Sequence, residues 1–142
     1  MAEVSTEARI EAPAEKVWAR LTDWSAYGDW NATHTSFPKG GPTALETGAT
    51  FLESMRLMGF PAEVEWTVEE LAPARVLAIR GKGPMSVTVA TRYTLVPDGD
   101  ATTVRIDGGF TGAAVSLMAG SLKDSATAAL HESLRRLAGL VA

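Results

Sequence analysis

The chain has 142 residues, a formal net charge of −4 and 46% hydrophobic residues. This length fits one domain over residues 1–142 and leaves no room for a second, and the composition is far from that of disordered chains. The acidic balance opposes binding to nucleic acid, which needs clustered Lys and Arg. With no cysteine, the chain has neither disulfides nor thiolate metal ligands, which fits a reducing compartment.

The sequence predicts neither a secretory signal nor a membrane-spanning helix. Its first residues lack the basic and apolar regions of a secretory signal. Its longest weakly polar stretch, residues 112–120, is far shorter than the ~20 apolar residues that a spanning helix needs. We therefore expect a cytoplasmic protein without integral membrane association. Nothing in the sequence decides its oligomeric state.

The first third of the chain predicts a strand, two short helices and a loop. Residues 3–11 alternate between apolar and polar side chains, the period of a half-buried strand. Pro13 suits the first turn of a helix, and Asp23 can cap a second short helix. Residues 34–48 are rich in glycine and proline and predict a loop, where we allow for a short edge strand at 34–37.

The remainder predicts a run of strands and a long helix. Short turns with glycine or proline separate strand-like runs at 50–58, 62–71, 75–82, 86–96 and 102–111. Short turns join antiparallel neighbours, and the alternation leaves one face of the sheet apolar and the other wet. Residues 114–141 repeat apolar side chains every three or four positions, which predicts one amphipathic helix able to cover the apolar face.

This order predicts an α+β helix-grip fold. Six or seven antiparallel strands should form a curved sheet around a long C-terminal helix, with two short helices after the first strand. The chain resembles the START/SRPBCC superfamily, which includes polyketide cyclase/dehydrase, lipid-transport and birch-pollen-allergen-like proteins. The resemblance is carried by residues 10–18, by residues 21–24 leading to Trp30-Asn31, and by the order of elements. It implies an apolar cavity between sheet and final helix, but the fold does not fix the activity.

A closer likeness is to an actinobacterial subgroup described as the toxin component of a toxin–antitoxin pair. It is carried by Asp23 with Tyr27 and Trp30, residues 58–61 and 65–67, Gly108-Gly109 and residues 132–134. This likeness implies a protein partner in place of a small ligand.

The candidate ligand contacts lie on the predicted inner face and near the cavity mouth. Trp66 is the preferred wall residue, since an aromatic side chain in mid-strand offers a large flat contact area. Methionines at 55, 58, 85 and 118 form either a pliable lining or ordinary core filling. The predicted binding residues are Trp30, Glu53, Met55, Trp66, Val89, Tyr93, Phe110, Met118 and Leu122.

Glu53 is the most informative polar residue of this set. It shares one face of its strand with Phe51 and Met55, and a carboxylate among apolar residues has its charged form disfavoured. If that face points inward, Glu53 is the best polar anchor or acid. In the opposite register Arg56 faces inward, and the sequence leaves the register open.

The histidines give no sign of a metal site. His34 and His131 are about a hundred residues apart and lack ligand spacing, so we predict neither a metal nor a cofactor. We expect His34 to be an exposed loop residue and His131 to be solvated.

Three functions stay open from the sequence. The first is binding of a small apolar ligand that resembles a lipid, polyketide or isoprenoid. The second is a cyclase, dehydrase or hydrolase that uses Glu53, Tyr93 or Arg56. Cyclases of the superfamily are associated with a pocket arginine and tyrosine, and residues 67–70 contain no arginine, which argues against that activity. The third is the toxin-like protein interaction.

Overall fold

The computed structural model describes residues 2–42, 44–57 and 60–141. Its centre is one antiparallel sheet of seven strands in the order β1-β7-β6-β5-β4-β3-β2. The strands are β1 (Ala2–Ile10), β2 (His34–Ser36), β3 (Thr50–Leu57), β4 (Phe60–Ala72), β5 (Val76–Lys82), β6 (Thr88–Asp98) and β7 (Ala101–Thr111). The expected antiparallel sheet is confirmed, and the short edge strand that we allowed for is β2.

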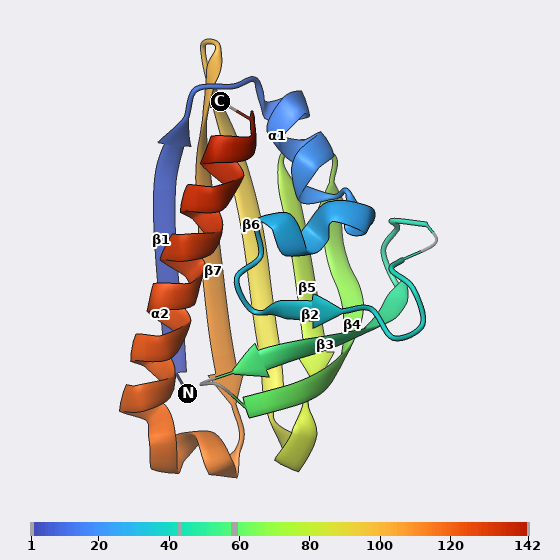
Figure 1. The fold of residues 1–142 in the computed structure, drawn as a ribbon, viewed down its shortest axis with the longest axis vertical. Coiled ribbons are helices and arrows are strands. Elements are labelled where there is room, and N and C mark those ends of the chain that lie inside the picture. Colours follow the sequence, from blue (N-terminus) through green and yellow to red (C-terminus); the bar gives the residue numbers. More distant parts are fainter. Residues whose placement is uncertain (1, 43, 58–59, 142) are drawn as a thin grey trace.

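The helices cover one face of this sheet. The long helix α2 (Ala113–Val141) runs along β1 and β7, while α1 (Ala14–Leu21) and the 3₁₀ helix η1 (Trp24–Asp29) lie over the upper part of the sheet (Figure 1). A third short helix, η2 (Pro84–Ser86), joins β5 to β6. No helix in the part of the chain that the structure describes is long and apolar enough to cross a membrane.

The short helices follow their sequence signals with one correction. Pro13 precedes α1, which buries Val17 and Leu21 against the core. Asp23 holds the N-cap position of η1, but its side chain makes no capping hydrogen bond. The prediction of a side-chain cap is therefore wrong, because Asp23 Oδ1 instead accepts a hydrogen bond of 2.6 Å from Ser25 Oγ.

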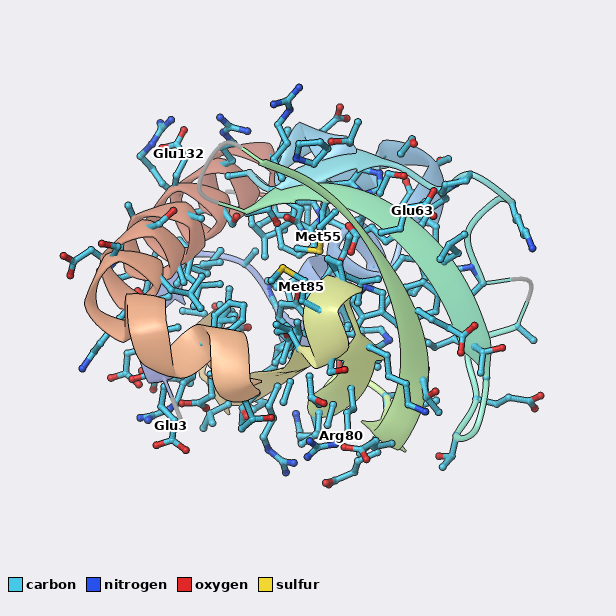
Figure 2. The ribbon with its side chains drawn as sticks, turned by 90° about the horizontal axis from the view of Figure 1, so that it is seen from below. Glu3, Met55, Glu63, Arg80, Met85 and Glu132 are labelled. Carbon is cyan, nitrogen blue, oxygen red and sulfur yellow. The ribbon has the colours of Figure 1, made fainter. Side chains whose placement is uncertain are left out.

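The two faces of the sheet differ as the alternation predicts. On β4, Val64 and Trp66 are buried, whereas Glu63 and Glu65, which alternate with them, are exposed. Figure 2 shows Met55 on the inner side of the curled sheet and Glu63 and Arg80 on its outer side. The core therefore lies between the concave face of the sheet and the helices.

The β6–β7 hairpin shows how turn chemistry fixes the sheet register. Its last paired residues are Asp98 and Ala101, so Gly99 and Asp100 form a two-residue turn. Gly99 has a φ of 61°, and a turn of type II′ requires such a positive φ at its first central position. Glycine adopts it without steric cost.

Besides its apolar packing, α2 is joined to other described elements by two side-chain hydrogen bonds. His131 lies on the exposed side of the helix, as expected, yet its Nδ1 is 2.8 Å from Thr6 Oγ1 on β1. Ser133 is buried, and its Oγ accepts a hydrogen bond of 2.9 Å from the backbone N–H of Ala32. This second bond ties the η1–β2 connection to the helix.

Aromatic side chains fill the space between η1 and the sheet. The ring of Tyr27 lies 5.0 Å from Trp30 and 5.3 Å from Trp24, measured between centroids. Tyr27 Oη is 3.3 Å from Tyr93 Oη, and both residues are buried. Burial is the largest cause that raises the pKa of each tyrosine, because it disfavours the phenolate.

The β4–β5 pair depends on a missing side chain. Gly81 is paired with Trp66 across the two strands, and the indole ring covers the glycine. A Cβ at position 81 would lie 2.8 Å from Cε3 of Trp66 and closer still to Cγ1 of Val64. The indole of Trp66 can therefore pack over position 81 only because residue 81 has no side chain.

We expect Gly81→Ala to lower the free energy of unfolding by about 1–3 kcal/mol, since overpacking a filled core displaces side chains. The matched control is Gly120→Ala on the exposed side of α2, where a Cβ would meet nothing within 4 Å. That change should stabilise the protein by roughly 1 kcal/mol through helix propensity. Urea unfolding measures both, and unchanged stability in the Gly81 variant would contradict the packing described above.

The two buried tyrosines predict an abnormal alkaline titration. Tyr27 and Tyr93 are the only tyrosines in the chain, so tyrosinate absorbance reports on them alone. Their pKa values are raised in the folded state, so the stability they contribute is complete below about pH 10, where free tyrosine ionises, and falls as the pH rises above it. We expect little tyrosinate in the folded protein until alkaline unfolding begins, and normal ionisation in guanidinium. Normal ionisation of the folded protein would show that the phenols are accessible.

Candidate functional site

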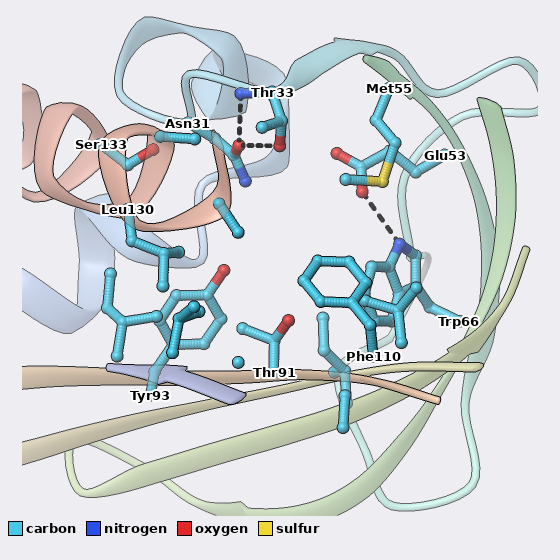
Figure 3. A pocket seen from close by; sticks show the side chains of 18 of the residues that line it. Asn31, Thr33, Glu53, Met55, Trp66, Thr91, Tyr93, Phe110, Leu130 and Ser133 are labelled. Atoms are coloured by element: carbon cyan, nitrogen blue, oxygen red, sulfur yellow. Dashed lines mark hydrogen bonds between the residues drawn. The ribbon is translucent and has the colours of Figure 1, made fainter. Parts of the chain in front are cut away.

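A cavity of about 70 Å³ lies between the concave face of the sheet, the η1–β2 connection and α2 (Figure 3). Its walls are mostly apolar. The aromatic wall residues are Tyr27, Trp30, Trp66, Tyr93 and Phe110. The other lining residues are Val4, Asn31, Thr33, Glu53, Met55, Ile79, Val89, Ala90, Thr91, Ile106, Gly108, Ala126, Ala129, Leu130 and Ser133.

Small residues on facing elements account for this space. Ala126 and Ala129 lie one helical turn apart on α2, and Gly108 lies on the inward face of β7. Side chains of this size leave a gap between helix and sheet where larger ones would close it. The cavity is therefore a consequence of composition at a few positions.

Glu53 supplies the buried carboxylate of the cavity wall. Phe51, Glu53 and Met55 are all buried on the inward face of β3, whereas Arg56 is exposed. The structure thus answers the question of register that the sequence leaves open. Glu53 is only 2% exposed, and its two oxygens have different partners.

Both carboxylate oxygens accept hydrogen bonds from aromatic rings. Trp66 Nε1 donates to Glu53 Oε1 at 2.9 Å, and His34 Nδ1 donates to Oε2 at 2.6 Å. Hydrogen bonds to a charged acceptor are stronger than neutral ones, and they offset part of the cost of removing the carboxylate from water. The three residues come from three adjacent strands, β2, β3 and β4.

The environment of His34 differs from the sequence-based expectation. We expected an exposed loop histidine, but the side chain is only 8% exposed, so that prediction is wrong. The reason is that residues 34–36 pair with β3 and bring the ring beside Glu53. The ring also packs against Tyr27 and Phe37, at centroid distances of 5.1 and 4.5 Å.

A chain of hydrogen bonds crosses the opposite part of the wall. The backbone N–H and the hydroxyl of Thr33 both donate to Asn31 Oδ1, at 3.1 and 3.0 Å. The amide group of Asn31 is hydrogen-bonded to Tyr27, an interaction that acts to lower the pKa of this tyrosine. The hydroxyl of Tyr27 is in turn hydrogen-bonded to that of Tyr93. The charge of Glu53 adds to burial in raising the pKa of both tyrosines, so this carboxylate lies within electrostatic reach of the phenols.

Trp30 differs from these residues in having an unused donor. Its side chain is 1% exposed and lines the cavity. Within the described ranges its Nε1 is the one fully buried side-chain nitrogen or oxygen without a hydrogen-bond partner. Such orphaned donors are rare in folded proteins, and they point to a missing acceptor.

Most of the predicted binding residues meet at this cavity. Leu122 is buried on α2 but does not line the cavity, and the side chain of Met118 lies outside the described residues. The predicted residues that line the cavity are Trp30, Glu53, Met55, Trp66, Val89, Tyr93 and Phe110.

The methionine-lining hypothesis fails at one position. Met85 is 79% exposed, so its predicted place in a lining is wrong. The backbone explains this, because Met85 lies in η2 with a φ of 59° and the turn directs its side chain to solvent. Met55 does line the cavity, and Met58 lies outside the described residues.

Several wall residues were absent from the sequence-based set. Thr91 belongs to the inward alternation of β6, and Ser133 falls on the apolar stripe of α2 beside Leu130 and Leu134, so both positions could have been found from periodicity. Asn31 and Thr33 lie in an irregular connection, where no periodic signal exists.

The fold recurs in solved structures. Protein CV1439 of Chromobacterium violaceum matches with a TM-score of 0.74 and 18% identity, covering 99% of this chain and 98% of that one. A START superfamily protein from Mycobacterium smegmatis matches with a TM-score of 0.70 and 20% identity, covering 99% and 100%. The Zhui aromatase/cyclase from Streptomyces sp. R1128 matches with a TM-score of 0.73 and 18% identity, covering 97% and 92%. These matches confirm the helix-grip fold of the START/SRPBCC type.

Sequence similarity gives the family. The uncharacterized protein Rv1546 of Mycobacterium tuberculosis is 26% identical over 97 residues, which is 68% of each chain. The likeness to the toxin subgroup stays a prediction. A family model described as polyketide cyclase / dehydrase and lipid transport matches residues 1–142. The chain therefore belongs to the polyketide cyclase / dehydrase and lipid transport family.

Proposed function

We propose that the protein binds a compact, mainly apolar small molecule in the cavity between sheet and α2. The observation that carries this proposal is the cavity itself, with five aromatic residues and one buried carboxylate in its wall. Small-molecule sites characteristically combine apolar walls with a few placed polar groups. Lipid transport in the description of the family supports the same conclusion.

The volume of the cavity favours a compact ligand. About 70 Å³ is well below the roughly 300–1,000 Å³ of typical ligand pockets. A lipid or polyketide of ordinary size would enter only if wall side chains changed rotamer, and the unbranched Met55 is the most adaptable of these. Of the lipid, polyketide and isoprenoid classes, the smallest members fit best.

A catalytic role is the second candidate, and the orientation of Glu53 supports it. Two hydrogen bonds hold the carboxylate in the wall, and each oxygen keeps a lone pair for a ligand. Such a group can take a proton from a bound molecule or return one. The described lining contains neither arginine nor lysine, which counts against a cyclase that orients its substrate through a pocket arginine.

Filling the cavity tests the binding proposal. We expect Ala129→Leu, which extends a side chain into the cavity, to reduce the amount of small molecule that co-purifies with the protein by at least roughly tenfold, as a filled site loses its apolar contacts. The measurement is native mass spectrometry of the purified protein, followed by extraction and identification of what it carries.

The matched control is Ala128→Leu, at the neighbouring, exposed position of the same helix. This variant should carry as much ligand as the wild type. If Ala129→Leu retains the ligand, the cavity is not the binding site. If the wild type carries nothing and binds no lipid, polyketide mimic or hydrophobic dye, the binding proposal fails and a protein-interaction role gains support.

Glu53→Gln separates binding from catalysis. The glutamine amide keeps the shape of the side chain and an acceptor for Trp66 Nε1, but it cannot take up a proton at neutral pH. Under the catalytic candidate, the variant binds the extracted ligand within roughly threefold of the wild type and loses its conversion to product, followed by mass spectrometry. Equal conversion by both proteins would exclude Glu53 as the acid or base.

A further inference from the structure

The cavity wall contains a hydrogen-bond donor that is not paired with an acceptor. Trp30 lines the cavity, and its fully buried Nε1 can only donate a hydrogen bond. No described residue accepts a hydrogen bond from it. Leaving a buried donor without a partner costs on the order of 1–3 kcal/mol. A protein that keeps such a group in a cavity wall gains from a bound molecule that supplies an acceptor.

The tyrosine pair adds a second unused proton. Tyr27 and Tyr93 carry two hydroxyl protons, but the single contact between their oxygens uses only one. Asn31 adds no acceptor there, because the N–H of Thr33 identifies the occupied atom as Oδ1 and leaves the amide nitrogen for Tyr27. One phenolic proton therefore stays available, and Figure 3 shows the Tyr93 hydroxyl directed toward the middle of the cavity.

The charges in the wall decide what kind of acceptor can enter. Glu53 is buried in the same wall, and its charge helps to raise the pKa of both tyrosines. The described lining residues include no lysine or arginine that would balance a second anion. A carboxylate ligand would therefore meet like charge in an apolar site, which is costly, whereas an uncharged oxygen would not.

We propose that the ligand of this cavity is a compact, uncharged carbonyl compound whose oxygen accepts a hydrogen bond from Trp30 Nε1, with the tyrosine pair as the neighbouring donor. This inference rests on the proposed binding function and names the chemical class of its ligand. It assigns Trp30 as the residue that distinguishes a carbonyl from a hydrocarbon of the same shape. Glu53, in the wall of the same cavity, rejects anions.

Three probes of similar size separate these properties. Cyclopentanone carries the carbonyl, methylenecyclopentane replaces its oxygen by a CH₂ group, and cyclopropanecarboxylate, which also has six non-hydrogen atoms, carries a charge. Each is titrated into ¹⁵N-labelled full-length protein, and the indole N–H signals of the four tryptophans are followed by NMR. The Trp30 signal is identified by its absence in Trp30→Phe.

We expect cyclopentanone to move the Trp30 indole proton downfield, because that proton gains an acceptor. Methylenecyclopentane should change it only through ring contacts. The Trp66 indole is the internal reference, because its N–H already donates to Glu53. The carboxylate should bind at least roughly tenfold more weakly than the ketone, which corresponds to the cost of placing a second charge in the site.

The affinity ratio of the two neutral probes isolates the hydrogen bond from changes in shape. In Trp30→Phe the preference for ketone over alkene should fall by roughly 3- to 10-fold, the range expected for one net hydrogen bond. Trp24→Phe is the matched control, because Trp24 packs beside Tyr27 without lining the cavity. It should leave the ratio unchanged. Thermal unfolding of both variants verifies that they are folded.

The outcomes distinguish the two proposals. If both neutral probes bind but the Trp30 indole and the affinity ratio do not respond to the carbonyl, the binding function stands and the carbonyl assignment is overturned. A carboxylate that binds as well as the ketone also overturns it. If no probe binds at the cavity, the proposed function fails and the assignment fails with it. Should Trp30→Phe not fold, the Trp30 signal is assigned by exclusion from single Phe variants of Trp18, Trp24 and Trp66, and the wild-type titration then decides.

Discussion

A carboxylate held inside an apolar wall is the constraint on which the site depends. Glu53 on β3 is bonded to His34 on β2 and to Trp66 on β4, so one side chain joins three neighbouring strands. Removing a partner from a buried charge is costly, commonly about 3–5 kcal/mol. The bond between His34 and Glu53 therefore stabilises the short strand β2 at the sheet edge, in addition to its few backbone pairs.

The position of Trp66 depends in turn on a chain of steric conditions. Its indole reaches Glu53 because the ring lies over Gly81, the one residue type that leaves room for it. On the other side of the cavity, the Ser133–Ala32 bond holds the η1–β2 connection against α2, and this connection carries Asn31 and Thr33 into the wall. Packing and polar bonding therefore determine the wall together.

The sequence predicts much of this arrangement where periodicity applies. The alternation of β4 assigns Trp66 inward, and the three-and-four spacing assigns α2, because both signals depend on local geometry. The side of β3 that carries Glu53 is not predictable from its own residues, since apolar side chains occur on both faces. It is decided by pairing with β4 and by the partner that His34 supplies from a distant segment. The exposure of His34 was wrongly predicted for the same reason.

The features that set the size of the cavity and those that set its polarity lie on different parts of the chain. Ala126, Ala129 and Gly108 determine its width from α2 and β7, whereas Glu53 and Trp66 form its polar side on β3 and β4, with His34 of β2 bonded to Glu53. A substitution in the first group can change which molecular shapes are admitted without disturbing the carboxylate. Ligand size and ligand chemistry can therefore diverge independently, which offers a physical route by which one fold serves proteins that share only about a fifth of their residues.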